Sequence, residues 1–272
     1  MDGDLSQFPP SEDPNAGLIQ PSVAQVAALT VALQRHNLPL RGVRRIGPVE
    51  AALIPLARRL GDDHASFRAL LERAKASADG RHPCQKLNLH DAPGSLIAKV
   101  VPMARELERY GMLSRQHYLK SPTKMLQIWA TAEPRVRAFL TGIWLEYYAY
   151  DLAQDAVRRQ GQQQDAVFSS VQATVPPGDA FDLDVCILRH DGAMVWIETK
   201  TGRRFNEMLP KYARVAQQLG LEPRRAILLC PDVTVADDST VVTGAIAGMT
   251  ITGLERFPTV LAQALSEPAG LA

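Results

Sequence analysis

The sequence predicts an α/β protein in which a mixed sheet flanked by helices follows a mainly helical region. Two observations lead to this prediction. Residues 21–76 carry apolar side chains at helical spacing, with proline, serine or aspartate at the expected helix starts. From residue 166 onward, short apolar runs bounded by turn residues alternate with helical patterns, which is typical of a sheet covered by helices.

The bulk composition excludes several classes of protein. Of the 272 residues, 46% are hydrophobic and 22% are charged, which indicates an ordinary globular chain. A formal net charge of +1 argues against a tail-driven polyanion binder but permits a local basic surface. Three cysteines (Cys84, Cys186 and Cys230) without a CxxC pair predict reduced thiols and a cytoplasmic protein. No signal peptide and no membrane-spanning run is recognised, so no membrane partner is expected.

Four regions are expected along the chain. Residues 1–20 are acidic and proline-rich and predict a flexible tail. Residues 21–95 form a helical N-terminal region, of which 78–95 resembles a linker. Residues 96–133 combine an amphipathic helix with two short strands and predict a winged-helix-like segment. Residues 134–272 have the size of a single mixed α/β domain.

Basic residues are concentrated in two of these regions. In the winged-helix-like segment they indicate either a nucleic-acid face or a solvated face. In the helical N-terminal region, Arg44 and Arg45 are the candidate substrate-binding pair; the region either positions nucleic acid or a partner or is a structural cap on the following domain. The basic residues are Arg105, Arg109, Arg115, Lys120 and Lys124 in the segment, and Arg35, Arg41, Arg44, Arg45, Arg58 and Arg59 in the N-terminal region.

The expected C-terminal domain opens with one long helix and continues as three strands, a helix and further strands. An Asp191-Gly192 dipeptide predicts a tight turn between the second and third strands. The expected elements are helices at 133–160, 206–220 and 257–266 and strands at 166–175, 181–190, 193–201, 225–230 and 249–253.

The central constellation of the sequence consists of Asp184, Glu198 and Lys200. Glu198 and Lys200 lie two residues apart on one strand and therefore share a face, and the tight turn brings Asp184 beside them. Two such carboxylates suit Mg²⁺ or Mn²⁺, which lowers the pKa of a bound water. Lys200 can orient or deprotonate that water, or neutralise charge on the phosphorus. This set resembles the active site of PD-(D/E)xK nucleases, and the resemblance implies a restriction-endonuclease-like fold and a metal-dependent endonuclease.

Burial supports this interpretation, because the charges interrupt the apolar runs VCIL and MVWI, where unpaired ions are costly. The alternative is a Glu198–Lys200 pair at the surface of an edge strand. Glu146 lies on the apolar stripe of the long helix and has either the metal site or an arginine as its partner. Asp182 is a second ligand or only a neighbour. Lys211 contacts phosphate or is solvated.

Three segments, FLTGIWLEYYAYDLA, FDLDVCILRH and WIETKTG, resemble the nuclease domain of CRISPR-associated effectors activated by cyclic oligoadenylate. The resemblance covers roughly residues 100–250. It implies an active-site set of Glu146, Asp184, Glu198 and Lys200, with Lys211 as an addition, and it implies a homodimer. The first 95 residues show no strand series and no Gly-rich phosphate loop, so no ring-nucleotide sensor is expected.

The leading function is therefore hydrolysis of phosphodiester bonds in DNA, RNA or both, in defence against phage or mobile DNA. The enzyme is expected to stand alone or to be regulated by a partner or by its own N-terminal region. Two alternatives remain at this point. One is a non-catalytic nucleic-acid-binding protein on the same fold, and the other is a restriction or repair endonuclease, for which no base-reading side chains are recognisable.

Overall fold

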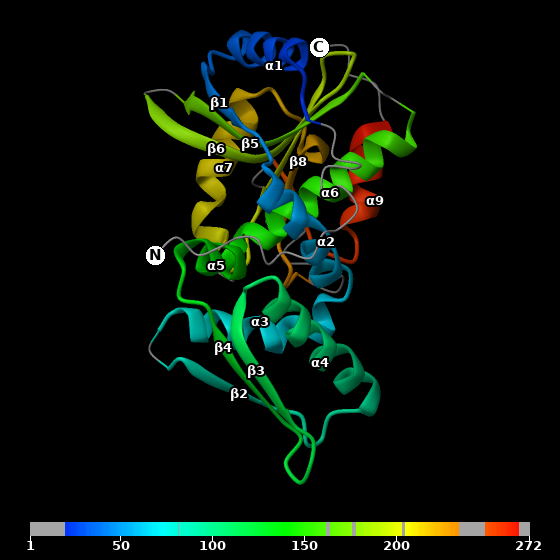
Figure 1. Ribbon diagram of the computed structural model, residues 1–272. Coiled ribbons are helices and arrows are strands. Elements are labelled where there is room, and N and C mark those ends of the chain that lie inside the picture. Colours follow the sequence, from blue (N-terminus) through cyan, green and yellow to red (C-terminus); the bar gives the residue numbers. More distant parts are fainter. Residues whose placement is uncertain are drawn as a thin grey trace. The chain divides into compact units, whose positions relative to one another are not determined.

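A computed structural model describes residues 20–80, 82–161, 164–175, 178–202, 205–233 and 248–266 (Figure 1). The chain forms two compact units. The small unit contains Asp62–Trp144, and the large unit combines Gly17–Gly61 with Leu145–Ala272. Most of the expected N-terminal tail, residues 1–19, lies outside the described residues. Among the described residues, no helix has both the length and the apolar character needed to cross a bilayer.

The large unit is built on a six-stranded mixed sheet with strand order β1-β5-β6-β7-β8-β9. The first four strands in this order pair antiparallel, whereas β7, β8 and β9 are parallel neighbours. This confirms the expected mixed sheet. The strands are β1 (Leu40–Arg44), β5 (Ala166–Val175), β6 (Asp179–Leu188), β7 (Met194–Thr199), β8 (Ala226–Leu229) and β9 (Thr250–Thr252).

Helices cover this sheet and bury its apolar side chains. Helices α1 and α7 pack against the side of the sheet that carries Trp196 and Leu228, both fully buried. Helix α6 contacts two other helices: Arg58 of α2 forms ion pairs with α6, and Tyr148 of α6 lies 6.4 Å from Phe257 of α9 between ring centroids. The helices are α1 (Val23–Arg35), α2 (Pro48–Asp62), α6 (Trp144–Arg159), α7 (Leu209–Gln218) and α9 (Phe257–Ser266).

The long helix expected at 133–160 has an internal irregularity. It begins as α5 (Pro134–Ala138), passes through a π-helical turn at Phe139–Ile143 and continues as α6. Such turns are rare and occur frequently at functional sites. Glu146 follows this turn by three residues, so the candidate site residue lies next to the irregular segment.

The small unit places two helices on one face of a three-stranded antiparallel sheet with strand order β2-β4-β3. Leu126 and Ile128 of β4 are fully buried beneath the helices. The predicted helix and hairpin of residues 96–133 are confirmed, but their winged-helix character stays a prediction. The elements are α3 (His64–Ala78), β2 (Cys84–Asn88), α4 (Gly94–Arg109), β3 (Leu113–Leu119) and β4 (Met125–Ala130).

Two strands were not expected from the sequence. The N-terminal region was predicted to be helical with a linker at 78–95, yet β1 and β2 lie within it. Both are five-residue strands with weak alternation, LRGVR and CQKLN. Each gains its ladder from a distant partner, β5 for β1 and β4 for β2, so tertiary pairing outweighs local propensity.

Candidate active site

Asp184 and Glu198 lie next to each other on neighbouring strands. Val185 of β6 pairs with Ile197 of β7 in an antiparallel ladder. Asp184 directly precedes Val185 and Glu198 directly follows Ile197, so the two acidic residues occupy opposed positions on the neighbouring strands. The Oδ2 atom of Asp184 accepts two hydrogen bonds of 2.8 Å, from the backbone N–H and the hydroxyl of Thr199. These bonds fix the orientation of the Asp184 carboxylate, and the predicted proximity of the two residues is confirmed.

The Glu198 side chain is buried, and its two oxygens differ. Oε1 lies 3.0 Å from the Nζ atom of Lys200. Oε2 is buried, and no hydrogen-bond partner for it is found among the described residues. A buried carboxylate oxygen without a partner is costly. This oxygen therefore provides the structural feature that a divalent cation would fit, together with the neighbouring carboxylate of Asp184.

Lys200 is held at the end of β7, one residue beyond the strand. Its backbone N–H donates a 2.9 Å hydrogen bond to the carbonyl of Leu229 in β8, which extends the ladder. The side chain points to the same side as Glu198, as the alternation of the strand predicts. Glu198 belongs to a strand inside the sheet, so the alternative of a surface pair on an edge strand is wrong.

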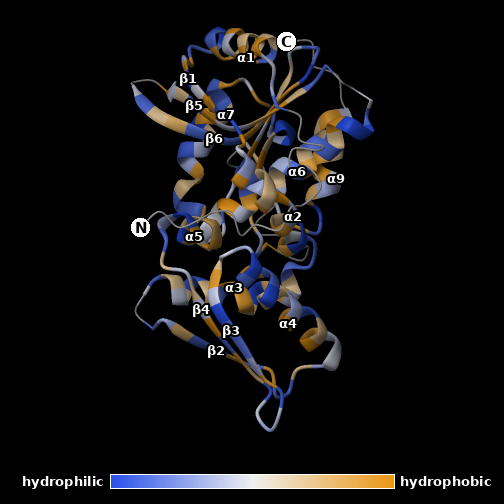
Figure 2. Ribbon diagram, in the orientation of Figure 1, coloured by the Kyte–Doolittle hydropathy of each residue, from blue (hydrophilic) through white to orange (hydrophobic). Residues whose placement is uncertain are grey.

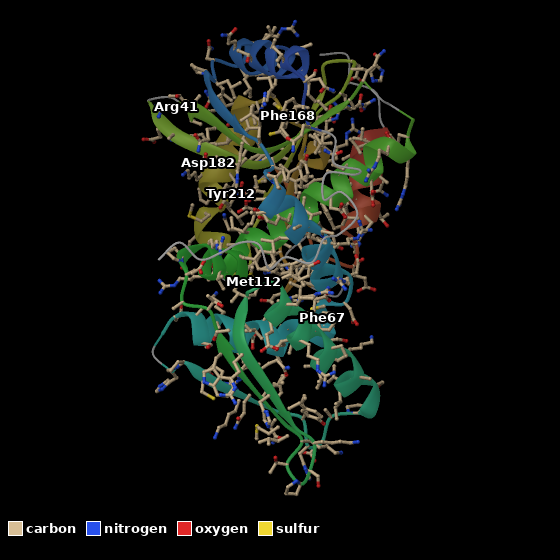
Figure 3. All side chains as sticks on the ribbon, viewed as in Figure 1. Arg41, Phe67, Met112, Phe168, Asp182 and Tyr212 are labelled. Carbon is tan, nitrogen blue, oxygen red and sulfur yellow. The ribbon has the colours of Figure 1, made fainter. Side chains whose placement is uncertain are left out.

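Tyr212 of α7 completes the contacts around the lysine, and the sequence analysis did not single it out. Its hydroxyl takes part in hydrogen bonds with both Glu198 and Lys200. Its ring lies 5.7 Å below Nζ of Lys200 and packs edge-on against Trp196 and Phe181. Figure 3 labels Tyr212 on α7 and Asp182 on β6, the exposed residue that follows Phe181. The apolar stripe of α7, which includes Tyr212, was the available signal.

Burial and like charges make the carboxylates of this site poor acids. Burial, with the nearby Asp184 carboxylate, raises the pKa of Glu198 to about 8. The pKa of Asp184 is raised as well, mainly by burial, although Lys200 and Thr199 oppose the shift. Burial alone would lower the pKa of Lys200, but Glu198 and Asp184 outweigh it and raise that pKa above its usual value. Lys200 is therefore a cation at neutral pH.

Glu146 is electrostatically connected to this cluster. Burial and the Asp184 carboxylate raise its pKa to about 7, while Arg44 and Lys200 lower it. Asp184, a predicted metal ligand, and Arg44 thus both act on the charge of this residue, and the two predicted partners remain open. Among the described residues, no three His, Cys, Asp or Glu side chains gather closely enough to form a complete metal cage. A cation at this site would thus rely on Asp184 and Glu198 together with water or substrate oxygens.

The three predicted substrate-binding residues have different surroundings. Arg44, at the end of β1, donates 3.2 Å hydrogen bonds to the hydroxyl of Tyr147 and to Glu50. The next residue, Arg45, is exposed. Lys211 is exposed on α7, with Nζ 5.0 Å above the ring of Phe181. Of these three residues, Arg44 is the one whose charge lowers the pKa of Glu146.

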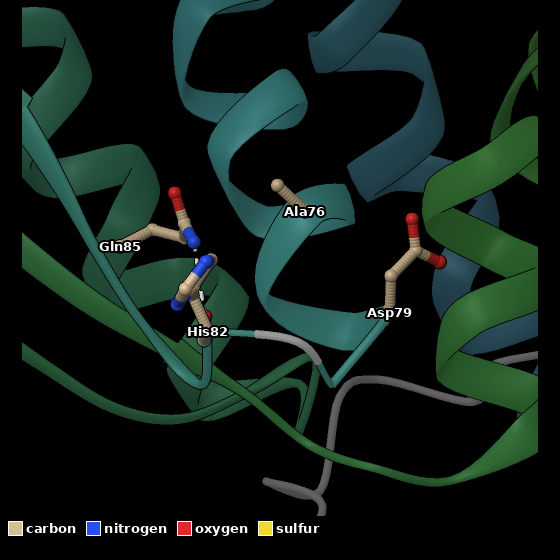
Figure 4. A pocket seen from close by; sticks show the side chains of 4 residues that line it. All are labelled: Ala76, Asp79, His82 and Gln85. Atoms are coloured by element: carbon tan, nitrogen blue, oxygen red, sulfur yellow. Dashed lines mark hydrogen bonds between the residues drawn. The ribbon is translucent and has the colours of Figure 1, made fainter.

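A separate hollow of about 640 Å³ lies in the small unit and is lined by Ala76, Asp79, His82 and Gln85 (Figure 4). Gln85 donates a 2.9 Å hydrogen bond to the carbonyl of His82. Asp79 lies 4.0 Å from Arg137. The described residues that line the hollow include none of the predicted site residues.

Two solved structures have a fold similar to that of this chain. No protein-family model and no curated protein matches the chain. Can2 from Sulfobacillus thermosulfidooxidans, solved in complex with cyclic tetra-adenylate, is similar over 86% of this chain, with a TM-score of 0.56 and 14% identity. Protein VC1899 from Vibrio cholerae is similar over 91%, with a TM-score of 0.55 and 16% identity.

The chain shares their fold. It spans only about three-fifths of their lengths, 59% of Can2 and 60% of VC1899. At these identities the similarity concerns the fold alone. A function for this chain therefore has to be inferred from its own residues.

Proposed function

We propose that the chain is a metal-dependent endonuclease of the PD-(D/E)xK type that hydrolyses phosphodiester bonds in DNA, RNA or both. The observation that carries the proposal is the pair formed by Glu198, which is buried, and Asp184, which is partly buried. Their carboxylates lie on adjacent strands, one Glu198 oxygen has no described partner, and Lys200 pairs with the other. Hard oxygen ligands of this kind fit Mg²⁺ or Mn²⁺.

Each residue of the cluster has a distinct role in this proposal. Asp184 and Glu198 hold the cation, which when bound supplies an acidic water and polarises a phosphoryl oxygen. Lys200 remains protonated, because the carboxylates raise its pKa, and it stabilises negative charge on the phosphorus rather than removing a proton. Glu146 adds a third carboxylate near Asp184 that can orient the attacking water.

The proposed substrate is a polyanion, and exposed cations of the large unit suit its phosphates. Arg44, Arg45 and Lys211 are proposed to bind backbone phosphates, since charge-assisted contacts of this kind need no base recognition. The fold shared with Can2, which was solved with a cyclic nucleotide, supports a role in antiphage defence. A homodimer and a regulatory partner are further parts of this proposal, and ring-nucleotide sensing by this chain itself is not.

The first prediction concerns Asp184→Ala. Plasmid, single-stranded DNA and RNA are incubated with the protein in Mn²⁺ or in EDTA. We expect cleavage in Mn²⁺ only and a loss of at least about 100-fold in Asp184→Ala, because one of the two metal ligands is gone. Circular dichroism should show an intact fold, since removing one of two neighbouring carboxylates relieves their repulsion. Full activity of this variant, or activity in EDTA, would contradict the proposal.

Lys200→Ala separates catalysis from metal binding in the same assay. An ammonium group cannot be a ligand, so calorimetry should give a nearly unchanged Mn²⁺ affinity while kcat falls strongly. Lys75→Ala, at an exposed position of α3, serves as the matched control. Nucleic-acid binding with no cleavage under any metal condition would favour the non-catalytic alternative.

A further inference from the structure

One face of the three-stranded sheet in the small unit is open to solvent. In the β2–β4 and β3–β4 ladders, directly paired residues point to the same side. Helices α3 and α4 cover the side with Leu126 and Ile128. The opposite side, here called the open face, consists of three rows of three residues: Cys84, Trp129 and Arg115; Lys86, Gln127 and His117; and Asn88, Met125 and Leu119.

The open face is basic and amphipathic. None of its nine side chains is acidic, and Lys86, Arg115 and His117 are exposed. The acidic residues Glu72 and Glu106 of the same unit belong to the helices behind the sheet. Figure 2 shows β3 as largely hydrophilic. The open face also has an apolar part, because the side chain of Leu119 is 36% exposed. A surface of this kind is complementary to an anionic ligand that also has flat apolar parts.

Trp129 is the most informative residue of the open face. It lies in the central strand, is partly exposed and has the guanidinium of Arg115 5.3 Å from its ring centroid. A tryptophan that served only as core would belong on the side of Leu126 and Ile128. An aromatic ring and an arginine on an open sheet provide stacking planes for unpaired bases, while neighbouring lysines bind the phosphates.

We infer that the open face binds single-stranded nucleic acid. In this inference, Trp129 and Arg115 stack on bases, and Lys86 and His117 contact the sugar–phosphate backbone of the strand. Gln127 lies between Lys86 and His117 and supplies an amide for hydrogen bonds. A duplex would offer no free base to Trp129, which is why a single strand fits better. This site lies in the small unit and does not depend on the proposed catalytic cluster, which lies in the large unit.

Binding of the full chain to labelled single-stranded DNA and RNA oligonucleotides is measured by fluorescence anisotropy in EDTA, which separates binding from cleavage. Trp129→Ala should weaken binding by about 10-fold or more through the lost stacking, while Trp129→Phe should retain most of it. Lys86→Ala with Arg115→Ala should lower affinity and reduce the salt slope by up to about 1.4 units. The control, Arg73→Ala with Lys75→Ala, removes the same charge from exposed positions of α3.

The inference is overturned if Trp129→Ala binds like the unaltered chain, or if the Lys86/Arg115 and Arg73/Lys75 variants lose the same affinity. It is also overturned if duplex DNA binds as tightly as single strands and depends equally on Trp129. A change in sedimentation of the Trp129→Ala protein without any change in oligonucleotide binding would assign the face to a protein contact. If the chain cleaves nucleic acid but the open face fails these tests, only the open-face inference is overturned and the nuclease proposal still holds.

Discussion

The candidate catalytic cluster owes its electrostatic properties to the surroundings of its individual carboxylates. Asp184 and Glu198 are ordinary residues whose pKa values are raised mainly by burial, and that of Glu198 also by the Asp184 carboxylate. Their positions followed from strand alternation and the Asp191-Gly192 turn, where Gly192 adopts the positive φ of 82° that such a turn requires. Tyr212 could not be assigned in the same way, because nothing in a helical stripe shows which lysine and carboxylate its hydroxyl will meet.

The pKa of Glu198 predicts how stability depends on pH in the absence of metal. The carboxyl titrates near 4.5 when unfolded and near 8 when folded, so the folded chain holds an extra proton between these values. Folding stability therefore decreases as pH rises from about 5 to 8, by up to ~1.4 kcal/mol per pH unit for this one group. Glu198→Gln cannot release this proton, so its free energy of unfolding should fall less over the same range.

Urea unfolding in EDTA at pH 5, 6, 7 and 8 measures this difference. Glu72→Gln, at an exposed position of α3, is the matched control. Parallel pH profiles for Glu198→Gln and the unaltered chain would show that Glu198 is already ionised in the metal-free fold. Adding Mn²⁺ should flatten the profile of the unaltered chain, because cation binding favours the charged carboxylates.

At the scale of elements, helix packing around α6 brings backbone and ring into close contact. Gly61 of α2 faces the ring of Tyr148, and a Cβ atom at position 61 would overlap with Cδ2 of that ring. Tyr148 is only 2% exposed and packs against Phe257, so it has little room to move. Gly61→Ala should lower the free energy of unfolding by about 1–3 kcal/mol through overpacking, despite the better helix propensity of alanine.

Chemical denaturation of this variant is compared with Gly142→Ala, a second helical glycine whose added Cβ would meet no atom within 4 Å. The control should be neutral or slightly stabilised. Equal effects of the two substitutions would mean that Tyr148 can yield and that the contact does not constrain α2 and α6.

The elements were predictable where local signals were strong. Strand β5 and helix α9 have the bounds given by the sequence pattern, 166–175 and 257–266. Strands β1 and β2 were missed because Gly42 and several charged residues give them little intrinsic strand character. The π-helical turn before Glu146 also has no local signature, since FLTGI fits an ordinary helix.

For the whole molecule, the two units present different cationic surfaces to a nucleic acid. In the large unit, Arg44 is tied to Glu50 and Tyr147, whereas Arg45 is exposed. In the small unit, the basic residues of the open face include Lys86 and Arg115, and Arg115 lies over Trp129. An overall charge near zero is therefore compatible with binding, because the cations are locally concentrated.

If Arg44 and Arg45 contact phosphates, the double variant Arg44→Ala, Arg45→Ala should weaken nucleic-acid binding and flatten its salt dependence. The expected reduction is about one unit of slope per lost contact on duplex DNA and somewhat less on a single strand. Anisotropy titrations in EDTA at several salt concentrations measure it, with Arg73→Ala, Lys75→Ala as the charge-matched control. Because Arg44 also hydrogen-bonds Glu50, its loss has a structural component that urea unfolding detects separately. Unchanged affinity and slope at both low and high salt would instead favour the alternative that the N-terminal region, residues 21–95, is structural.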